Sequence, residues 1–194
     1  MDCDKMGRLI LSLRREKNMT QKQLADELMI SDKTISKWER AQGCPDVSLL
    51  HRLSEVLGVN IEEILKGDLE ANREDGGNMK RLKWYVCPTC GNLLTSTSDA
   101  VVSCCGRKLT AMEARQADEE HQLTIETVED EFYITFSHEM KKEHFLHFIA
   151  YVCCDRVLLV KLYPEQGGEV RLPRIYGGKF YFGCSRHGLW WQKG

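Results

Sequence analysis

Apolar residues recur at helical spacing through the first third of the chain. The stretches in which they fall three or four residues apart are "MGRLILSLRREK", "QKQLADELM", "KTISKWERA", "VSLLHRLSEVLG" and "NIEEILKG". Residue types that favour helix N-caps stand at or just before the start of four of them, at Thr20, Ser31, Asp46 and Asn60. The pattern predicts five short helices packed as one compact domain over residues 1–67.

The chain then changes character twice. Residues 68–82, "DLEANREDGGNMKRL", are polar, contain a glycine pair and show no period, which predicts a linker. From about His121 onward, short β-branched or aromatic segments alternate with charged or glycine-rich turns, a spacing typical of an antiparallel sandwich or barrel. The segments are "QLTIETV", "EFYITF", "FLHFIAYV", "RVLLVKLY", "VRLPRIY" and "KFYFG".

Length and composition limit the classes of protein that fit. The 194 residues suffice for one to three small domains, and the apolar runs are too short to cross a bilayer. The start, "MDCDKMGRLI", lacks the apolar stretch of a secretory signal, so we expect a cytoplasmic protein that does not enter a membrane. The net charge is −2, so any DNA contact must come from a local basic surface.

Nine cysteines are many for a chain of this kind. In a reducing cytosol they fit metal ligands or buried thiols better than disulfides. Cys153 and Cys154 are adjacent on a predicted strand, and we expect them to be structural thiols. Cys3 and Cys44 have no partner that the sequence makes visible. The other five cysteines lie in patterns that suit metal binding.

The helical segment resembles the helix-turn-helix domain of lambda-repressor/Cro-like regulators. The resemblance covers "MTQKQLADELMISDKTISKWERAQGCPDVSLLHRLSEVLGVNIEEIL". Ile35 and Trp38 would face the core, so the third helix would turn its polar side outward, as a helix entering the major groove requires. By this resemblance the partner is a double-stranded DNA operator, contacted by Gln21, Lys33, Thr34, Ser36, Lys37 and Arg40.

Basic residues on one helix can also form an ordinary solvated face, and it is the complete five-helix pattern that favours DNA binding. Residues 1–67 hold 11 basic and 11 acidic side chains, so the affinity of a single copy for DNA should be weak. We therefore expect a homodimer.

Two cysteine pairs follow the predicted linker. "YVCPTCGN" and "SCCG" supply four thiols that suit a closed tetrahedral site for zinc or iron, at Cys87, Cys90, Cys104 and Cys105. The second pair is adjacent, unlike that of an ordinary zinc ribbon. The arrangement resembles the desulforedoxin-type domain that opens desulfoferrodoxins, and it predicts a four-cysteine metal domain over residues 83–112. Ligand type leaves iron or zinc open.

A second set of metal-binding residue types lies further along the chain. In "CSRHGLW", Cys184 and His187 are three residues apart, and a tight turn lets both reach one ion at about 2.0–2.3 Å. His138 and His144 lie roughly 20 Å apart along a straight strand, so sharing an ion requires a turn in "EMKKE". His147, within an apolar run, is assigned to packing or to a hydrogen bond behind the site.

Residues 113–194 resemble the superoxide reductase domain of desulfoferrodoxins, which implies an immunoglobulin-like β-sandwich. The resemblance also implies Fe²⁺ held by four histidines and one cysteine, with one position left open. Superoxide binds at that position in the family, takes one electron and leaves as peroxide. The matching residues are His121, His138, His144, Cys184 and His187.

The family pattern fails at one position. Superoxide reductases carry a Glu-Lys pair before the first histidine, whereas this chain has Glu119 and Glu120. Glu119 matches the glutamate that is the sixth ligand of oxidised iron in the family, and Glu120 replaces the lysine. At about 6 Å and an effective dielectric near 20, each charge contributes on the order of 2–3 kcal/mol, so attraction of the anion becomes repulsion. Lys141 or Lys142 could compensate.

Three hypotheses follow from the sequence. The favoured one is a DNA-binding transcriptional regulator whose desulfoferrodoxin-like half binds iron and senses redox state, superoxide or oxygen. The alternative is an active superoxide reductase, an oxidoreductase that carries a helix-turn-helix domain. The third treats both metal sites as structural staples of an ordinary repressor.

Overall fold

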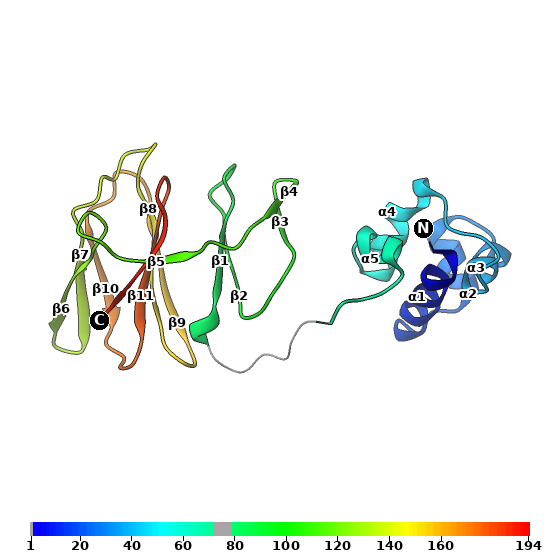
Figure 1. Cartoon of the computed structure of the whole chain (residues 1–194), viewed down its shortest axis with the longest axis horizontal. Coiled ribbons are helices and arrows are strands. Elements are labelled where there is room, and N and C mark those ends of the chain that lie inside the picture. The colour runs from blue at the N-terminus through cyan, green and yellow to red at the C-terminus, as the bar shows by residue number, and fades with distance from the viewer. Residues whose placement is uncertain (1, 72–78) are drawn as a thin grey trace. The chain divides into compact units, whose positions relative to one another are not determined.

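The computed structural model describes residues 2–71 and 79–194. They fall into two compact units, Met1–Ala71 and Asn72–Gly194 (Figure 1). Residues 72–78 of the predicted linker (68–82) lie outside the described residues, which resume with the short 3-10 helix η1 (Met79–Arg81).

Residues 2–71 form five α-helices, as the hydrophobic period predicts. They are α1 (Cys3–Glu16), α2 (Gln21–Leu28), α3 (Asp32–Glu39), α4 (Val47–Leu57) and α5 (Ile61–Lys66). The side chains of Thr20, Ser31 and Asp46 each accept a hydrogen bond from a backbone N–H in the first turn, whereas the Asn60 side chain makes no such bond. None of the helices in residues 2–71 and 79–194 combines the length and the apolar character that spanning a bilayer requires.

Helix α1 packs directly on α3, and this contact fixes the position of the third helix. Ile35 and Trp38 on α3 are buried, as predicted, at 0% and 4% exposure. A Cβ atom on Gly7 of α1 would lie 2.1 Å from the Trp38 carbonyl oxygen, so only glycine permits this approach. In the last turn of α1, Arg14 donates to both carboxylate oxygens of Glu39, at 2.6 and 3.0 Å.

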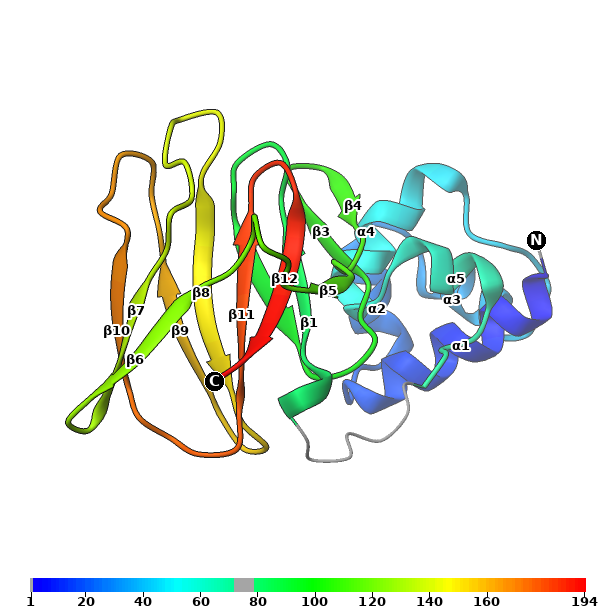
Figure 2. The ribbon, with the colours of Figure 1, turned by 60° about the vertical axis from the view of Figure 1, so that its left-hand side comes forward.

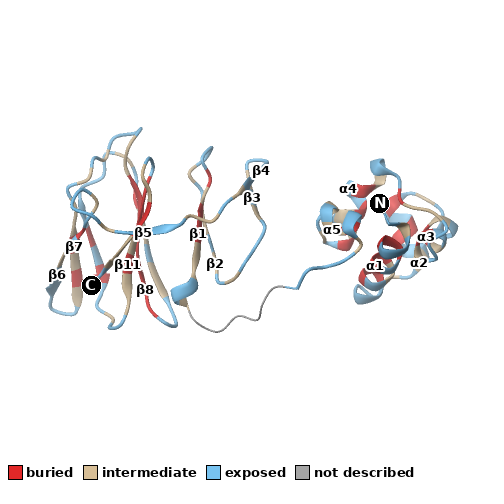
Figure 3. Cartoon of the chain, viewed as in Figure 1, coloured by how far each residue is buried: buried red, intermediate tan, exposed pale blue. Residues whose placement is uncertain are grey.

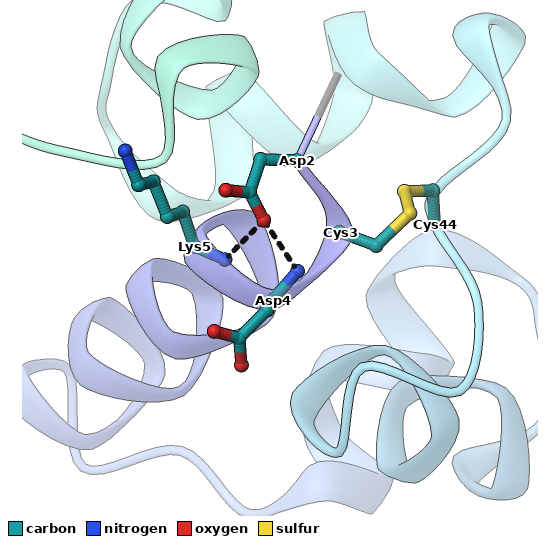
Figure 4. The surroundings of a disulfide bond; sticks show 5 residues. All are labelled: Asp2, Cys3, Asp4, Lys5 and Cys44. Carbon is teal, nitrogen blue, oxygen red and sulfur yellow. Dashed lines mark hydrogen bonds between the residues drawn. A yellow bond between two sulfur atoms is a disulfide. The ribbon is translucent and has the colours of Figure 1, made fainter.

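A disulfide joins Cys3 to Cys44, so the expectation of metal ligands or buried thiols in preference to disulfides is wrong for these two residues (Figure 4). Cys3 begins α1 and Cys44 lies in the loop between α3 and α4, with 5.2 Å between their Cα atoms. They are 41 positions apart in the chain, and only the packing of α1 on α3 brings them together. No local sequence pattern carries that information.

The second unit is built mainly of strands. In chain order they are β1 (Lys83–Val86), β2 (Leu93–Ser96), β3 (Val102–Cys104), β4 (Arg107–Leu109), β5 (Ala114–Gln116), β6 (Thr124–Val128), β7 (Glu131–Thr135), β8 (Leu146–Val152), β9 (Val157–Lys161), β10 (Glu169–Pro173), β11 (Lys179–Cys184) and β12 (Gly188–Lys193).

These strands form two larger sheets and two hairpins. The larger sheets have the strand orders β5-β12-β11-β8-β9 and β10-β7-β6, and the hairpins are β1-β2 and β3-β4. The five-stranded sheet lies between the three-stranded sheet and the β1-β2 hairpin (Figure 2). The predicted β-sandwich is therefore confirmed, but β5 and β12 were missed, and β5 pairs with β12 in parallel.

Strand β8 is buried along its whole length because both of its faces are covered (Figure 3). Ile149 and Tyr151 belong to the core between the two sheets. Phe148 and Val152 point the other way, into a second core that includes Trp84 of β1. The Trp84 and Phe148 rings stack with 4.8 Å between centroids, so the hairpin carrying the first cysteine pair is docked on the sandwich.

We predict that Gly7→Ala lowers the free energy of unfolding of the helical unit by about 2–3 kcal/mol, although alanine favours helices more than glycine. The added methyl group has no space beside the Trp38 carbonyl. Urea unfolding followed by the helical circular dichroism signal measures the change. Ser12→Ala, at an exposed position of α1, is the matched control and should change it by less than about 0.5 kcal/mol. Equal stability of the two variants would contradict the described contact.

Candidate metal centres

The β11-β12 hairpin delivers the cysteine and one histidine of the predicted second site. Cys184 ends β11, and His187 stands in the tight turn before β12. The turn directs two backbone N–H groups, those of Arg186 and His187, at the Cys184 sulfur, each at 3.4 Å. The Sγ atom also lies 3.6 Å from His187 Nδ1. Such N–H donors stabilise a thiolate, which is the metal-binding form of cysteine.

A second turn brings His138 and His144 together. Lys141 and His144 exchange backbone hydrogen bonds at 2.9 and 3.0 Å, so the predicted reversal in "EMKKE" is present. The centroids of the two imidazole rings are 4.6 Å apart. Strand β8 follows directly and pairs with β11, with a register shift at Gly183/Cys184. Extra residues of this kind are common beside functional sites because they re-aim side chains.

The four imidazole rings follow a square that is open on one side. Neighbouring centroids are 4.7 Å apart for His121 and His187, 4.7 Å for His187 and His144, and 4.6 Å for His144 and His138. The diagonal from the His138 centroid to the His187 centroid is 6.5 Å, as expected for a square with sides of this length. The fourth side, from His138 to His121, is longer than the other three, at 6.3 Å.

The donor atoms of His138, His144, Cys184 and His187 all lie within 4.8 Å of one another. Two ligands that each lie about 2.0–2.3 Å from one ion are at most about 4.6 Å apart, so this group is close to a binding geometry. His121 stands just outside the group, with its Nε2 atom 2.8 Å from His187 Nδ1. Its ring stacks on Trp190 with 4.3 Å between centroids.

Each of three histidines is oriented by a hydrogen bond on the ring nitrogen that faces away from the group. Nδ1 of His121 donates to Asp118 at 2.9 Å, and Nδ1 of His144 donates to Glu139 at 2.8 Å. Nδ1 of His138 donates to the backbone carbonyl of Glu139 at 2.6 Å. These bonds leave Nε2 unprotonated on all three rings, without a hydrogen-bond partner on His138 and His144 and in contact with His187 Nδ1 on His121.

Buried atoms without partners show that these residues fit a metal ion. Nε2 of His138 and Nε2 of His144 are buried and make no hydrogen bond. Burial also lowers the pKa of His138, so the ring stays neutral, as a metal ligand must be. Neutral nitrogens aimed at one another with no proton to share are unfavourable unless a cation lies between them.

The sequence analysis missed Asp118 and Glu139 as the residues that orient these rings. The one available signal was spacing, since Asp118 lies three residues before His121, where a turn lets a carboxylate reach the ring. The pKa of Glu139 falls to about 2 because Lys141 and then His144 hydrogen-bond to its carboxylate. The negative charge of Glu139 is therefore paired with Lys141 and with His144.

A cavity of 260 Å³ adjoins the group, and its lining includes Glu119, Glu120, His121 and His138. Among the lining residues in the described part of the chain, none is a lysine or an arginine. Lys141 pairs with Glu139, and Lys142 lines a separate cleft beside Cys87 and Cys184. Neither lysine that was considered as a replacement cation therefore lines this cavity.

The four cysteines of the first site converge as well. The sulfur atoms of Cys87, Cys90, Cys104 and Cys105 all lie within 4.8 Å of one another, and those of Cys90 and Cys104 are 3.6 Å apart. Gly91 and Gly106 have positive φ angles of 67° and 72°, which permit the two tight turns.

The pKa values of two thiols in this site, Cys87 and Cys105, are shifted in opposite directions. Backbone N–H groups, first that of Cys90, donate to the Cys87 sulfur and lower the pKa of Cys87 to about 6. The pKa of Cys105 rises to about 12, and the largest cause is hydrogen bonding to the Cys90 sulfur. Four thiolates so close together repel one another, and a bound cation removes that repulsion.

The predicted DNA-contacting residues lie on and beside α3. Lys33, Lys37 and Arg40 are exposed, and Thr34 and Ser36 are half-buried. Two of the predicted side chains already have partners within the unit. The Gln21 amide donates to Glu39 at 2.7 Å, and Arg40 Nε donates to the Ser36 carbonyl at 3.0 Å.

The fold and the two clusters together define a helix-turn-helix unit joined to a unit with the superoxide reductase fold. Residues 10–64 match the family model described as Helix-turn-helix. The crystal structure of the superoxide reductase from Treponema pallidum covers 58% of this chain and 98% of its own, with a TM-score of 0.50 and 20% sequence identity. The predicted resemblances are therefore confirmed, while the immunoglobulin-like detail stays a prediction.

Two curated relatives each match a limited part of the chain. The HTH-type transcriptional activator BcrR of Enterococcus faecalis is 39% identical over 77 residues, which are 38% of each protein. The Desulfoferrodoxin of Clostridium acetobutylicum is 34% identical over 53 residues, which are 27% of this chain and 42% of that protein. The chain thus spans less than half the length of either relative.

We predict that His147 makes the β unit less stable as the pH falls. Burial, and then Lys161, lower the pKa of His147 to about 4, so the folded ring stays neutral while the unfolded one binds a proton below about 6.5. Stability is therefore lost as the pH falls from 6.5 toward 4, by about 1 kcal/mol between pH 7.5 and 5.5.

His147→Gln should remove that part of the loss, measured by urea unfolding of metal-free protein at both pH values. The other histidines are present in both proteins, so the difference between the two isolates His147. The exposed His51→Gln is the control and should leave the loss for the β unit unchanged. An unaltered pH dependence in His147→Gln would refute the assignment.

Proposed function

We propose that this protein is a DNA-binding transcriptional regulator whose C-terminal part, organised as residues 83–112 and 113–194, binds iron and senses redox state, superoxide or oxygen. The gathering of four imidazoles and one thiol beside a cavity, in a chain that also carries a helix-turn-helix unit, is the observation that carries this proposal.

In the proposed DNA complex, α3 lies in the major groove of an operator and a homodimer supplies two such helices. Lys33, Thr34 and Lys37 meet base edges or the nearby backbone, supported by Ser36 and Arg40. Gln21 binds a phosphate. For this its amide either gives up the hydrogen bond to Glu39 or donates its second N–H group to the phosphate. The buried Arg14–Glu39 pair holds α3 at the angle that presents these side chains.

For the metal centres we propose iron at His121, His138, His144, Cys184 and His187, and iron or zinc at the four-cysteine site. Ferrous iron supplies a centre that can give one electron to superoxide or bind dioxygen. The chain holds three of the rings through Asp118 and Glu139, and the turn N–H groups stabilise the thiolate. His121 needs only a small movement to join the other four donors.

The charges around the cavity favour a sensor over an efficient reductase. Glu119 and Glu120 are the charged groups of its lining, and no described lysine or arginine lines it. An anion approaching by this route is repelled, and no ammonium group stands there to deliver protons. The complete set of five donors nevertheless favours superoxide reductase activity as the second candidate, with Glu119 as the sixth ligand of oxidised iron.

One experiment separates the two candidates. Protein is purified without air, its iron content and visible absorption are measured, and a DNA duplex is selected by repeated binding from a random library. A sensor should bind that duplex with at least about fivefold different affinity when the iron is reduced and when it is oxidised. His144→Ala should abolish the difference and the absorption of the oxidised centre while leaving helical content unchanged. Rapid peroxide formation from superoxide, together with equal DNA affinity in the reduced and the oxidised protein, would favour the reductase.

We predict that Glu120→Lys raises the second-order rate of superoxide consumption by about tenfold or more at low salt, because an attractive charge replaces a repulsive one at the cavity. Pulse radiolysis over a range of ionic strength measures the rate, and the gain should shrink as salt is added. Glu113→Lys makes the same change of charge at an exposed position outside the cavity lining and is the control. Equal rates in the two variants would discredit the account of Glu120.

A further inference from the structure

The disulfide between Cys3 and Cys44 has no part in either metal cluster. Cys44 lies in the loop after α3, facing the first turn of α1 where Cys3 stands (Figure 4). Both residues are half-buried rather than fully enclosed in the core of the unit. The bond sits in the part of the chain that the proposed function assigns to DNA reading, far along the sequence from the proposed iron ligands.

The disulfide completes a row of contacts between α1 and the third helix. Cys3, Gly7 and Arg14 are four and seven residues apart and so share one face of α1. Gly7 meets the Trp38 carbonyl, and Arg14 pairs with Glu39 at the end of α3. Cys3 adds a covalent link to the loop that leaves α3, where Ala41 has a positive φ of 56°.

We propose that Cys3 and Cys44 form a reversible oxidation site for hydrogen peroxide or a small organic hydroperoxide. In the reduced pair, one thiolate attacks the peroxide oxygen and becomes a sulfenic acid, and water or an alcohol leaves. The second thiol displaces the sulfenic hydroxyl as water and forms the disulfide. Two thiols lose two electrons in total and one peroxide bond gains them. A dithiol reductant reverses the step by thiol–disulfide exchange.

Placement of the second thiol, rather than activation of the first, distinguishes this pair. The Asp2 carboxylate accepts the N–H groups of Asp4 and Lys5, so the start of α1 has little capacity left to stabilise a Cys3 thiolate. The fold, however, holds Cys44 within bonding distance of Cys3. A sulfenic acid formed on either residue is therefore captured at once and protected from further, irreversible oxidation.

Closing the bond should restrain the loop at residues 40–46, which follows the helix proposed to enter the groove. In the reduced pair the Arg14–Glu39 and Gly7–Trp38 contacts still hold α3, but the loop loses its covalent tie. The oxidation state of the pair would then alter DNA binding independently of iron. That last consequence rests on the proposed function, whereas the oxidation chemistry does not.

The test uses the full chain, reduced with a dithiol, freed of reductant without air, and exposed to limiting hydrogen peroxide. Peptide mapping by mass spectrometry under non-reducing conditions follows the Cys3–Cys44 link. The exposed Cys154 is the internal reference. We expect the link to form at least about tenfold faster than any oxidised product of Cys154, and to reopen fully in the folded protein when a dithiol is added. A link that forms no faster than products of Cys154, or that a dithiol cannot open, would overturn the proposal.

Two variants separate this site from the rest of the protein. In Cys44→Ser, Cys3 should be trapped by a 1,3-dione probe as sulfenic acid and then pass to sulfinic acid, with helical content unchanged. His144→Ala, which removes a proposed iron ligand, should leave the rate of linking unchanged, so failure of the iron proposal is seen separately. Amide exchange at residues 40–44 and 46 should slow at least about fivefold on linking, and equal exchange in both states would overturn the claimed effect on the loop.

Discussion

Pairing of β11 with β8 on one side and β12 on the other is the constraint on which the second candidate metal site depends. It places the end of β11, with Cys184, beside the start of β8, where His144 has just been delivered by its turn. Two further bonds tie the same point, from Ser185 N to the Phe145 carbonyl and from Phe145 N to the Ser185 hydroxyl. His187 is brought to the same place because the turn between β11 and β12 is too short to put it elsewhere.

The helical unit was predictable because its information is local. Period, caps and the buried faces of Ile35 and Trp38 are set by residues close together in the sequence. The strands of the second unit were found where β-branched and aromatic residues alternate. "GLWWQK" was missed because its glycine and two tryptophans resemble a turn followed by an anchor, and β5 was missed because it is short and exposed.

The cysteines and histidines of the candidate site were predictable from the sequence, but the residues that orient the histidine rings were not. Cysteine and histidine are recognised by type and spacing, whereas Asp118 and Glu139 act through hydrogen bonds that appear only when the rings are placed. The same limit applies to the disulfide, whose partners are 41 residues apart and meet through helix packing. Sequence patterns report residues that are near in the chain, and these interactions depend on residues that are near in space.

The double burial of β8 has a consequence for how the cysteine hairpin can change. Trp84 holds β1 against Phe148 through ring stacking and apolar contact, and none of the four thiols takes part in that packing. The hairpin is therefore anchored by its tryptophan whether or not its sulfur atoms hold an ion. The packing of the hairpin and the chemistry of its thiols therefore depend on different side chains. The contact between Trp84 and Phe148, which covers the back of the sheet, does not depend on the state of the four thiols.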